Sequence, residues 1–175
     1  MQKRRPLNFV IAMVLVGAAI LSTRYYEVDL PLLRLLAGRN RIDPLSLHLS
    51  GEFVEGNLGT AQETDGSVTV RMIAQQYLFV PHCILVPAGT PVRVRITSAD
   101  AVHKLTFSGT DYSVKVVPGA VTEGRMEFSH AGEYQVPCRE FCGAGHFTMR
   151  SRLVVVPREQ FAALQPGERR DCEQR

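Results

Sequence analysis

The chain has 175 residues, of which 45% are hydrophobic, with a formal net charge of +3 at pH 7 and four cysteines. This length supports one domain of ordinary size with additional segments, and the composition is that of a globular protein. The small net charge argues against nucleic acid as a partner, and four cysteines are too few for a disulfide framework at this length.

The first predicted element is an apolar helix at the N-terminus. No charged residue occurs from Pro6 to Thr23, and a helix of that length spans about 27 Å, which suits a hydrocarbon core of about 30 Å. Basic residues precede the segment and two tyrosines follow it, which predicts a cytoplasmic N-terminus and an exported C-terminal part. We therefore predict a membrane anchor over residues 1–24. A cleavable signal peptide ending near Gly17-Ala18-Ala19 is the alternative, and it also exports the chain.

Residues 25–66 are predicted to connect this anchor to the main domain. Asp29 is a suitable N-cap and Gly38 a suitable C-terminal residue for a short leucine-rich helix. We expect that helix either to lie on the membrane surface or against a partner subunit, or to pack as a simple connector on its own domain. From Arg39 to Gly66 the sequence is polar and rich in turn residues, which favours an extended connector.

Residues 67–157 contain short apolar segments separated by turn residues. Apolar and polar residues alternate at Val68–Met72 and Val92–Ile96, which predicts strands with one face in water. Further strands are predicted at 77–80, 83–86, 104–107, 113–117, 121–128, 133–136 and 150–156. Many short strands with regular turns are typical of an all-β sandwich or barrel. Residues 158–175 are predicted to form a short helix as far as Leu164, followed by a charged, mobile tail.

Two cysteines lie outside any motif. Cys83 occurs in an apolar, strand-like run and is predicted to be a small buried hydrophobic residue. Cys172 occurs in the polar tail and is predicted to be a free thiol.

The segment Pro137–Met149 concentrates the ligands of a soft metal. It reads C-x3-C-x3-H-x2-M, with a glutamate between the two cysteines. Thiolate, imidazole and thioether select copper, zinc or iron–sulfur clusters, and a weak axial methionine beside His and Cys is typical of electron-transfer copper. Because two thiolates can bridge two ions, the spacing favours a dinuclear copper centre.

Two other interpretations of this segment remain open at this point. Cys138 and Cys142 can form a disulfide in an oxidising compartment. The same cysteines can join His103 and His146 in a tetrahedral zinc site, although thioether is not a ligand of structural zinc.

The segment resembles the CuA-binding loop of cytochrome c oxidase subunit II, whose pattern C-x-E-x-C-x3-H-x2-M it matches at every position. That family takes one more histidine from an upstream segment similar to S-x-D-V-x-H, which corresponds here to Ser98–His103. The resemblance covers about Val68 to Val156 and implies a cupredoxin-like Greek-key β-sandwich, preceded by one N-terminal transmembrane helix. The metal ligands that it implies are His103, Cys138, Glu140, Cys142, His146 and Met149.

The resemblance also implies a role for each ligand. The two cysteines would bridge two copper ions, and each histidine would bind one of them. Met149 and the backbone carbonyl of Glu140 would be weak outer ligands. The Glu140 carboxylate resembles the family position that binds Mg²⁺ or Mn²⁺ at the interface with the catalytic subunit, and oxygen ligands suit such an ion.

The implied function is that of an electron-accepting subunit of a membrane haem–copper oxidase. Electrons would come from cytochrome c or a similar periplasmic donor and pass to haem in catalytic subunit I, where oxygen is reduced. The chain would be a single-pass protein of the inner (plasma) membrane, with its C-terminal domain in the periplasm or outside. The alternatives are the CuA subunit of a nitric oxide reductase-type complex and a free-standing copper carrier.

The sequence departs from the family in two respects. It contains no tryptophan, whereas the family usually places one where electrons enter. Tyr77 or Phe79 is a candidate to replace it, and packing in the core is the alternative interpretation of both residues. Between Gly66 and Pro157 there are nine Lys or Arg and six Asp or Glu, a net charge of 9 − 6 = +3. Such a domain is not expected to steer a basic donor strongly, which predicts either a neutral or acidic donor or docking through largely apolar surfaces.

Overall fold

The computed structural model describes residues 5–25, 41–161, 169–170 and 172, and the chain divides into two units, Met1–Arg39 and Asn40–Arg175. The first contains helix α1, Arg5–Tyr25. Among the described residues, no helix is both long enough and apolar enough to cross a membrane. The leucine-rich helix predicted between Asp29 and Gly38 lies outside the described residues.

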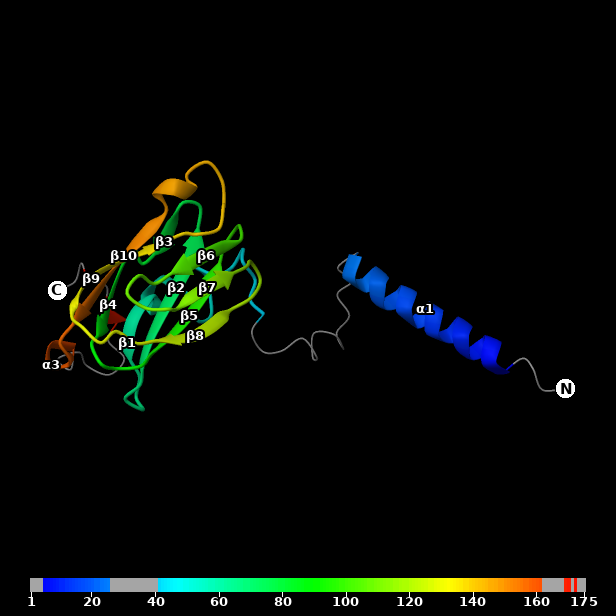
Figure 1. Cartoon of the computed structure of the whole chain (residues 1–175), viewed down its shortest axis with the longest axis horizontal. Helices are drawn as coiled ribbons and strands as arrows, with labels where there is room; N and C mark the ends of the chain where they lie inside the picture. The colour runs from blue at the N-terminus through cyan, green and yellow to red at the C-terminus, as the bar shows by residue number, and fades with distance from the viewer. Residues whose placement is uncertain (1–4, 26–40, 162–168, 171, 173–175) are drawn as a thin grey trace. The chain divides into compact units, whose positions relative to one another are not determined.

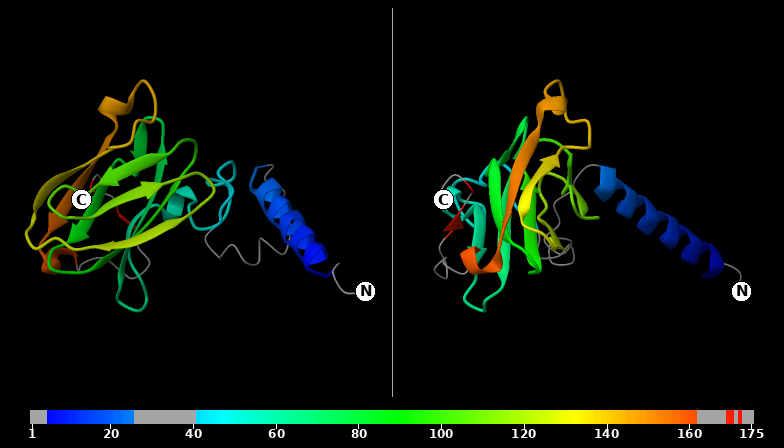
Figure 2. Two further views of the ribbon diagram at one scale, coloured as in Figure 1. Left: turned by 45° about the vertical axis from the view of Figure 1, so that its right-hand side comes forward. Right: turned by 60° about the vertical axis from the view of Figure 1, so that its left-hand side comes forward.

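The second unit is a layered β-sandwich (Figures 1 and 2). Its strands are β1 (Gly59–Gln62), β2 (Val68–Gln75), β3 (Leu78–Val80), β4 (Cys83–Pro87), β5 (Val92–Ser98), β6 (His103–Thr106), β7 (Ser113–Val116), β8 (Thr122–Met126), β9 (Gly132–Pro137), β10 (Arg150–Val156) and β11 (Arg169–Arg170). The larger sheet has the order β11-β1-β2-β5-β8, with β3 also paired to β2. A second sheet has the order β4-β10-β9, and β6 and β7 form a hairpin. The all-β prediction is confirmed.

The apolar residues of the predicted strands form the core between the sheets. On β2 and β5, the inward positions Val68, Val70, Met72, Val92, Val94 and Ile96 are all buried in one cluster. Alternation along each strand places these residues on one face of the larger sheet. The parallel pairing of β2 with β5 sets Val70 beside Val94 and Met72 beside Ile96, so the two strands contribute one continuous apolar surface.

The outer face of the larger sheet, predicted to be in water, is covered by residues that precede β1. Leu47 and Phe53 are buried there against Ile73 and Val121. The sequence around them is polar and turn-rich, which concealed both this cover and the short strand β1. Residues 41–58 therefore pack on the sheet in addition to leading into it.

Glu52 holds this cover in place through two arginines of the sheet. Its carboxylate accepts hydrogen bonds from Arg71 Nε at 3.0 Å and from Arg95 Nη2 at 2.7 Å. Burial raises the pKa of the Glu52 carboxyl, but the hydrogen bonds and charges of Arg95 and Arg71 outweigh burial, and the pKa lies below its ordinary value. A carboxyl with a lowered pKa stabilises the fold above its unfolded-state pKa, and this contribution disappears as the pH falls through the folded-state pKa.

Replacement of Glu52 with Gln is expected to lower the free energy of unfolding by about 2 kcal/mol at pH 7, because charge-assisted hydrogen bonds are lost. Urea denaturation at several pH values measures this difference. It should begin to shrink as the pH falls below the unfolded-state pKa of about 4.3, and it should disappear only as the pH falls through the lower folded-state pKa, where the wild-type carboxylate itself becomes protonated. Glu55→Gln, at an exposed position nearby, should change little. An equal loss at pH 7 and pH 3 would contradict the role of the Glu52 charge.

Cys83 is buried, as predicted, but the prediction of a free thiol at Cys172 and of a simple hydrophobic role for Cys83 is wrong, because the two residues form a disulfide. The strand β11 pairs with β1, and the chain then places Cys172 on the outer face of β4, where it is buried beside Leu85 and Val154. The described part of the tail is thus fixed to the domain. The sequence signal was weak, since 89 residues separate the two cysteines and each was interpreted from its local surroundings.

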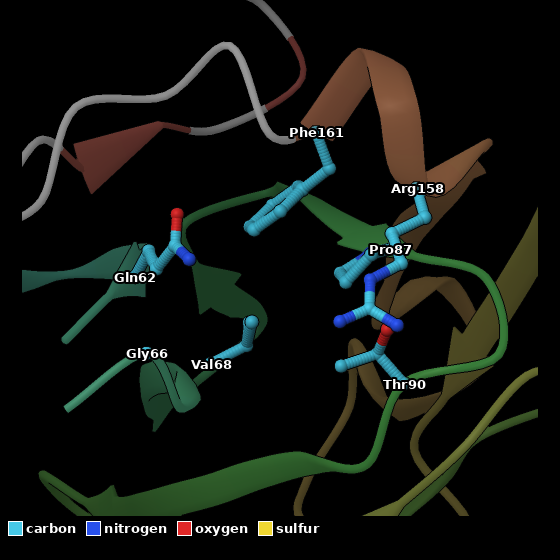
Figure 3. Close-up of a pocket in the computed structure, with 7 residues that line it drawn as sticks. All are labelled: Gln62, Gly66, Val68, Pro87, Thr90, Arg158 and Phe161. Atoms are coloured by element: carbon cyan, nitrogen blue, oxygen red, sulfur yellow. The ribbon is translucent and has the colours of Figure 1, made fainter.

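The end of the sandwich near α3 has a shallow hollow. The predicted C-terminal helix is confirmed only as α3, Arg158–Phe161, since residues 162–168 are outside the described part. Figure 3 shows the hollow, which lies between α3 and the turn after β1. It is lined by Gln62, Gly66, Val68, Pro87, Thr90, Arg158 and Phe161. The hollow lies beside α3, just beyond the C-terminal end of β10, whereas the predicted metal loop adjoins the opposite end.

Candidate metal centre

The predicted ligand loop connects β9 to β10 and projects from one end of the sandwich (Figure 1). Cys138 follows β9 directly, and Met149 immediately precedes β10. The backbone N–H of Cys138 donates to the carbonyl of Met149 at 3.0 Å, so the first and last donors are held by the same ladder that pairs the two strands. The two rigid strands therefore close the loop at its base.

His103 reaches the loop from the separate β6–β7 hairpin. It is the first residue of β6 and is fully buried. Leu105 forms an isolated bridge with Cys138, and the N–H of Arg139 donates to the carbonyl of Lys104 at 2.7 Å. These backbone contacts place the His103 imidazole beside the loop, with Nδ1 3.9 Å from Cys138 Sγ.

The two cysteine sulfurs face each other at 4.0 Å, and neither is in a disulfide. Each sulfur has its own imidazole nitrogen nearby, since His146 Nδ1 lies 3.7 Å from Cys142 Sγ. His146 comes from the short 3-10 helix His146–Thr148 and is half-buried. A disulfide requires a sulfur–sulfur distance of about 2.05 Å, so the alternative of a Cys138–Cys142 disulfide is not what this structure contains.

Two further predicted donors complete the group. Met149 Sδ lies 3.6 Å from Cys142 Sγ, and the carbonyl oxygen of Glu140 lies 3.3 Å from Cys138 Sγ. All six predicted ligand positions therefore meet at one place. Six soft or weak donors exceed the four that a structural zinc ion takes. Among the described residues, the group of His103, Cys138 and Cys142 is the one set of three metal-binding side chains whose ligand atoms lie within 4.8 Å of one another.

Asp100 orients the buried imidazole from behind. Its carboxylate accepts a hydrogen bond from His103 Nε2 at 3.0 Å and others from the N–H groups of Gln76 and Ala101 at 2.6 and 2.5 Å. Burial raises the pKa of the Asp100 carboxyl, but these hydrogen bonds outweigh burial and hold the pKa below its ordinary value. With its proton on Nε2, His103 presents a free Nδ1 to the sulfur side, which is how a ligand imidazole is commonly fixed. The predicted motif contained Asp100 but gave it no role.

The segment Gln76-Tyr77 clamps the loop from the other side, and sequence reasoning missed this contact. The Gln76 amide donates a hydrogen bond to the carbonyl of Cys142. A Cβ atom added to Gly143 would lie 2.5 Å from the Tyr77 hydroxyl, and one added to Gly145 would lie 2.5 Å from the Tyr77 ring. The two glycines are therefore needed for the close approach of Tyr77.

The Cys142 thiol of the loop holds its proton firmly. Burial, together with the neighbouring Cys138, raises the pKa of Cys142 to about 11. A soft metal binds the thiolate, so metal uptake at neutral pH must release a proton from this residue. The site therefore combines strong sulfur donors with a dry environment that disfavours an uncompensated negative charge.

The outer side of the centre is aromatic. The His146 ring stands at an angle to Phe141 and Phe147, with ring centroids 5.8 and 5.2 Å apart. Phe141 is 72% exposed and Phe147 is 86% exposed. Large apolar side chains exposed on one loop are typical of a surface that meets another protein.

Comparisons with known proteins show the family to which the chain is similar. The family profile described as "Cytochrome C oxidase subunit II, periplasmic domain" matches residues 65–156. A "Cytochrome c oxidase subunit 2" from Thermus thermophilus is 33% identical over 115 residues, which cover 66% of this chain and 85% of that protein.

Two solved structures have the same fold. The periplasmic domain of subunit II of cytochrome oxidase from Bradyrhizobium japonicum superposes with a TM-score of 0.50 at 21% identity, covering 54% of this chain and 88% of that one. A chain of a heme-copper terminal oxidase dimer superposes with a TM-score of 0.50 at 22% identity, covering 86% and 95%. At these identities the likeness concerns the fold.

Proposed function

This chain belongs to the cytochrome c oxidase subunit II family, and from that premise we propose that its loop holds a dinuclear copper centre through which electrons enter a haem–copper oxidase. One observation carries the proposal. Two unbonded sulfurs face each other at 4.0 Å, and each has a separate imidazole nitrogen within 4 Å. A pair of metal ions bridged by both sulfurs uses these four donors together with Met149 and the Glu140 carbonyl, whereas a single tetrahedral ion takes four donors and leaves the last two without a role.

The proposed ligands are Cys138 and Cys142 as bridges, His103 and His146 as one imidazole for each copper, and Met149 and the Glu140 carbonyl as weak outer donors. When bound, the copper pair supplies one-electron transfer. The protein supplies rigidity, because β9, β10 and β6 hold the donors and Asp100 fixes the buried imidazole. Ligands that barely move between oxidation states keep the reorganisation cost of electron transfer low.

Tyr77 is the better candidate for the aromatic residue through which electrons enter. It is 38% exposed and its ring lies against Gly143 and Gly145 of the loop. Phe79, the other candidate, is fully buried. Its ring stands edge-on to the His103 ring, and the two ring centroids are 6.4 Å apart. A donor docking at the surface can therefore touch Tyr77 but not Phe79.

The proposed partners are a catalytic subunit that contains haem and a cytochrome c or similar donor. We propose that residues 1–24 anchor the chain and that the copper domain faces the periplasm or outside. The Cys83–Cys172 disulfide supports an exported domain, because disulfides persist in oxidising compartments. The exposed Phe141 and Phe147 offer a surface on the metal loop for the catalytic subunit.

Metal analysis of the full chain tests the dinuclear centre. The protein, purified in detergent and loaded with copper under reducing conditions, should bind two copper ions per chain. After oxidation by one electron, electron paramagnetic resonance should show a single unpaired electron shared equally by two copper nuclei. One zinc ion per chain, or the spectrum of an isolated copper ion, would refute the proposal.

Replacement of Met149 with Leu is expected to leave both coppers bound and to raise the reduction potential by tens of millivolts, on the order expected when a weak axial donor to the oxidised state is lost. Spectroelectrochemical titration measures the shift. Met72→Leu is the matched control, because Met72 is equally buried but lies in the core of the sandwich. Loss of copper from the Met149 variant would show that the thioether is a principal ligand.

A hard cation at Glu140, which the family resemblance implies, fits the surrounding residues poorly. The Glu140 carboxylate is the oxygen ligand that this chain would offer to Mg²⁺ or Mn²⁺. It is already paired with Lys115, whose Nζ lies 3.3 Å from Glu140 Oε2. Mg²⁺ and Mn²⁺ prefer oxygen ligands and retain several waters, and an adjacent ammonium group repels them.

A further inference from the structure

The corner of the domain that carries Glu140 is positively charged. Lys115 lies on β7 directly opposite Lys104 on β6, and residues that face each other across antiparallel strands project from the same side. The N–H of Arg139 bonds to the carbonyl of Lys104, which adds a third cationic residue next to Glu140. Like charges directly opposite each other on neighbouring strands destabilise a hairpin, so the Glu140 carboxylate compensates a local excess of positive charge.

From this arrangement we infer that Lys115 takes the place of a divalent cation at Glu140, so that this subunit recruits neither Mg²⁺ nor Mn²⁺ through that carboxylate. The inference rests on the proposed function, since it concerns the side of the copper loop that would meet a catalytic subunit. The inference involves only residues of this chain, and it changes none of the proposed copper ligands.

The electrostatic reason for excluding the ion is that a divalent cation and the Lys115 ammonium would compete for the same Glu140 carboxylate. A divalent ion on Glu140 would lie within a few ångströms of the Lys115 ammonium, whose nitrogen is 3.3 Å from Glu140 Oε2. At a distance of 4 Å the repulsion between a divalent and a monovalent cation weakens binding by more than tenfold, even in water. Among the described residues, Glu140 belongs to no group of three His, Cys, Asp or Glu side chains that could hold an ion.

The ion pair also has a structural consequence that a bound ion would not share. It connects the loop that carries both cysteines to the hairpin that carries His103. The Glu140 side chain is thereby held on the hairpin side, while its carbonyl oxygen points to Cys138 Sγ at 3.3 Å. Because Lys115 is part of the chain, this connection requires no metal ion and is insensitive to chelators.

The test compares manganese binding in the assembled complex, isolated through a tag on this chain from cells grown with Mn²⁺ and then washed with EDTA. The wild-type complex should contain no stoichiometric manganese whose paramagnetic resonance depends on Glu140. Lys115→Met should increase Mn²⁺ affinity about tenfold or more, and Lys115→Met combined with Glu140→Gln should remove the gain. Lys104→Met is the matched control, because it removes one charge from the same hairpin but not the partner of Glu140, and it should gain much less.

Two results would overturn the inference. One is an EDTA-resistant manganese ion in the wild-type complex that disappears in Glu140→Gln. The other is a Lys115→Met complex that gains no affinity for Mn²⁺. Copper content and the copper spectrum are recorded on the same samples. A missing copper pair, or failure of this chain to isolate a haem-containing partner, refutes the proposed function and is thus distinguished from a wrong assignment of Lys115.

Discussion

Replacement of either loop cysteine with serine is expected to abolish the shared copper centre and with it electron transfer to the catalytic subunit. Each cysteine sulfur is proposed to bridge both ions, so Cys138→Ser and Cys142→Ser should have the same outcome although the two residues face different histidines. A serine hydroxyl is a hard donor with a much higher pKa, and it does not replace a thiolate for copper. Copper content should fall from two ions per chain to one or none, and the remaining signal should come from one copper nucleus.

The matched control is the double variant Cys83→Ser with Cys172→Ser. It makes the same chemical change at the two cysteines that lie outside the loop and are joined in a disulfide. This variant should still bind two coppers and show the shared-electron spectrum at a temperature where it is folded. If a single loop variant retained two equivalent coppers, one thiolate would be sufficient as a bridge, and the proposed ligand set would be wrong.

The same double variant is expected to show the largest loss of stability of any change outside the metal centre. The disulfide joins residues 89 positions apart, and a cross-link over a loop of that length stabilises by about 4.6 kcal/mol in the chain-entropy description. It also connects β4, at the edge of one sheet, with the segment after β11, which pairs with β1 of the other sheet. Its removal therefore eliminates the covalent link between the two sheets. Thermal and urea denaturation of the metal-free protein measure the loss.

Reduction of the wild-type disulfide is a second way to the same result. A mild reductant should lower the stability of the wild type to that of the double variant and leave the variant unchanged. If the double variant and the wild type had equal midpoints in urea, the C-terminal segment would contribute nothing to the stability of the domain. A loss of copper at low temperature would instead show that the disulfide supports the metal loop.

The ligand loop could be predicted because its chemistry is contiguous. Five of the six proposed positions lie between Cys138 and Met149, and the spacing of soft donors along one short segment specifies the class of metal. His103 was placed with them only through the family resemblance, since 35 residues separate it from Cys138. The pairing of β6 with β7 and the bridge from Leu105 to Cys138 bring it there.

The sequence by itself determined the all-β class, the positions of most strands and the donors of the loop. Alternation of apolar and polar residues reports which side of a strand faces the core, and this information is local. Tertiary structure alone decided what covers the far side. Arg71 and Arg95 mark a wet face in the sequence, yet Glu52 and the segment around Phe53 lie on it. It also decided the pairing of Cys83 with Cys172, the contact of Tyr77 with the loop glycines and the ion pair of Lys115 with Glu140. These contacts join residues that are distant along the chain, and they depend on strand order and register, which the packing of the whole sandwich sets.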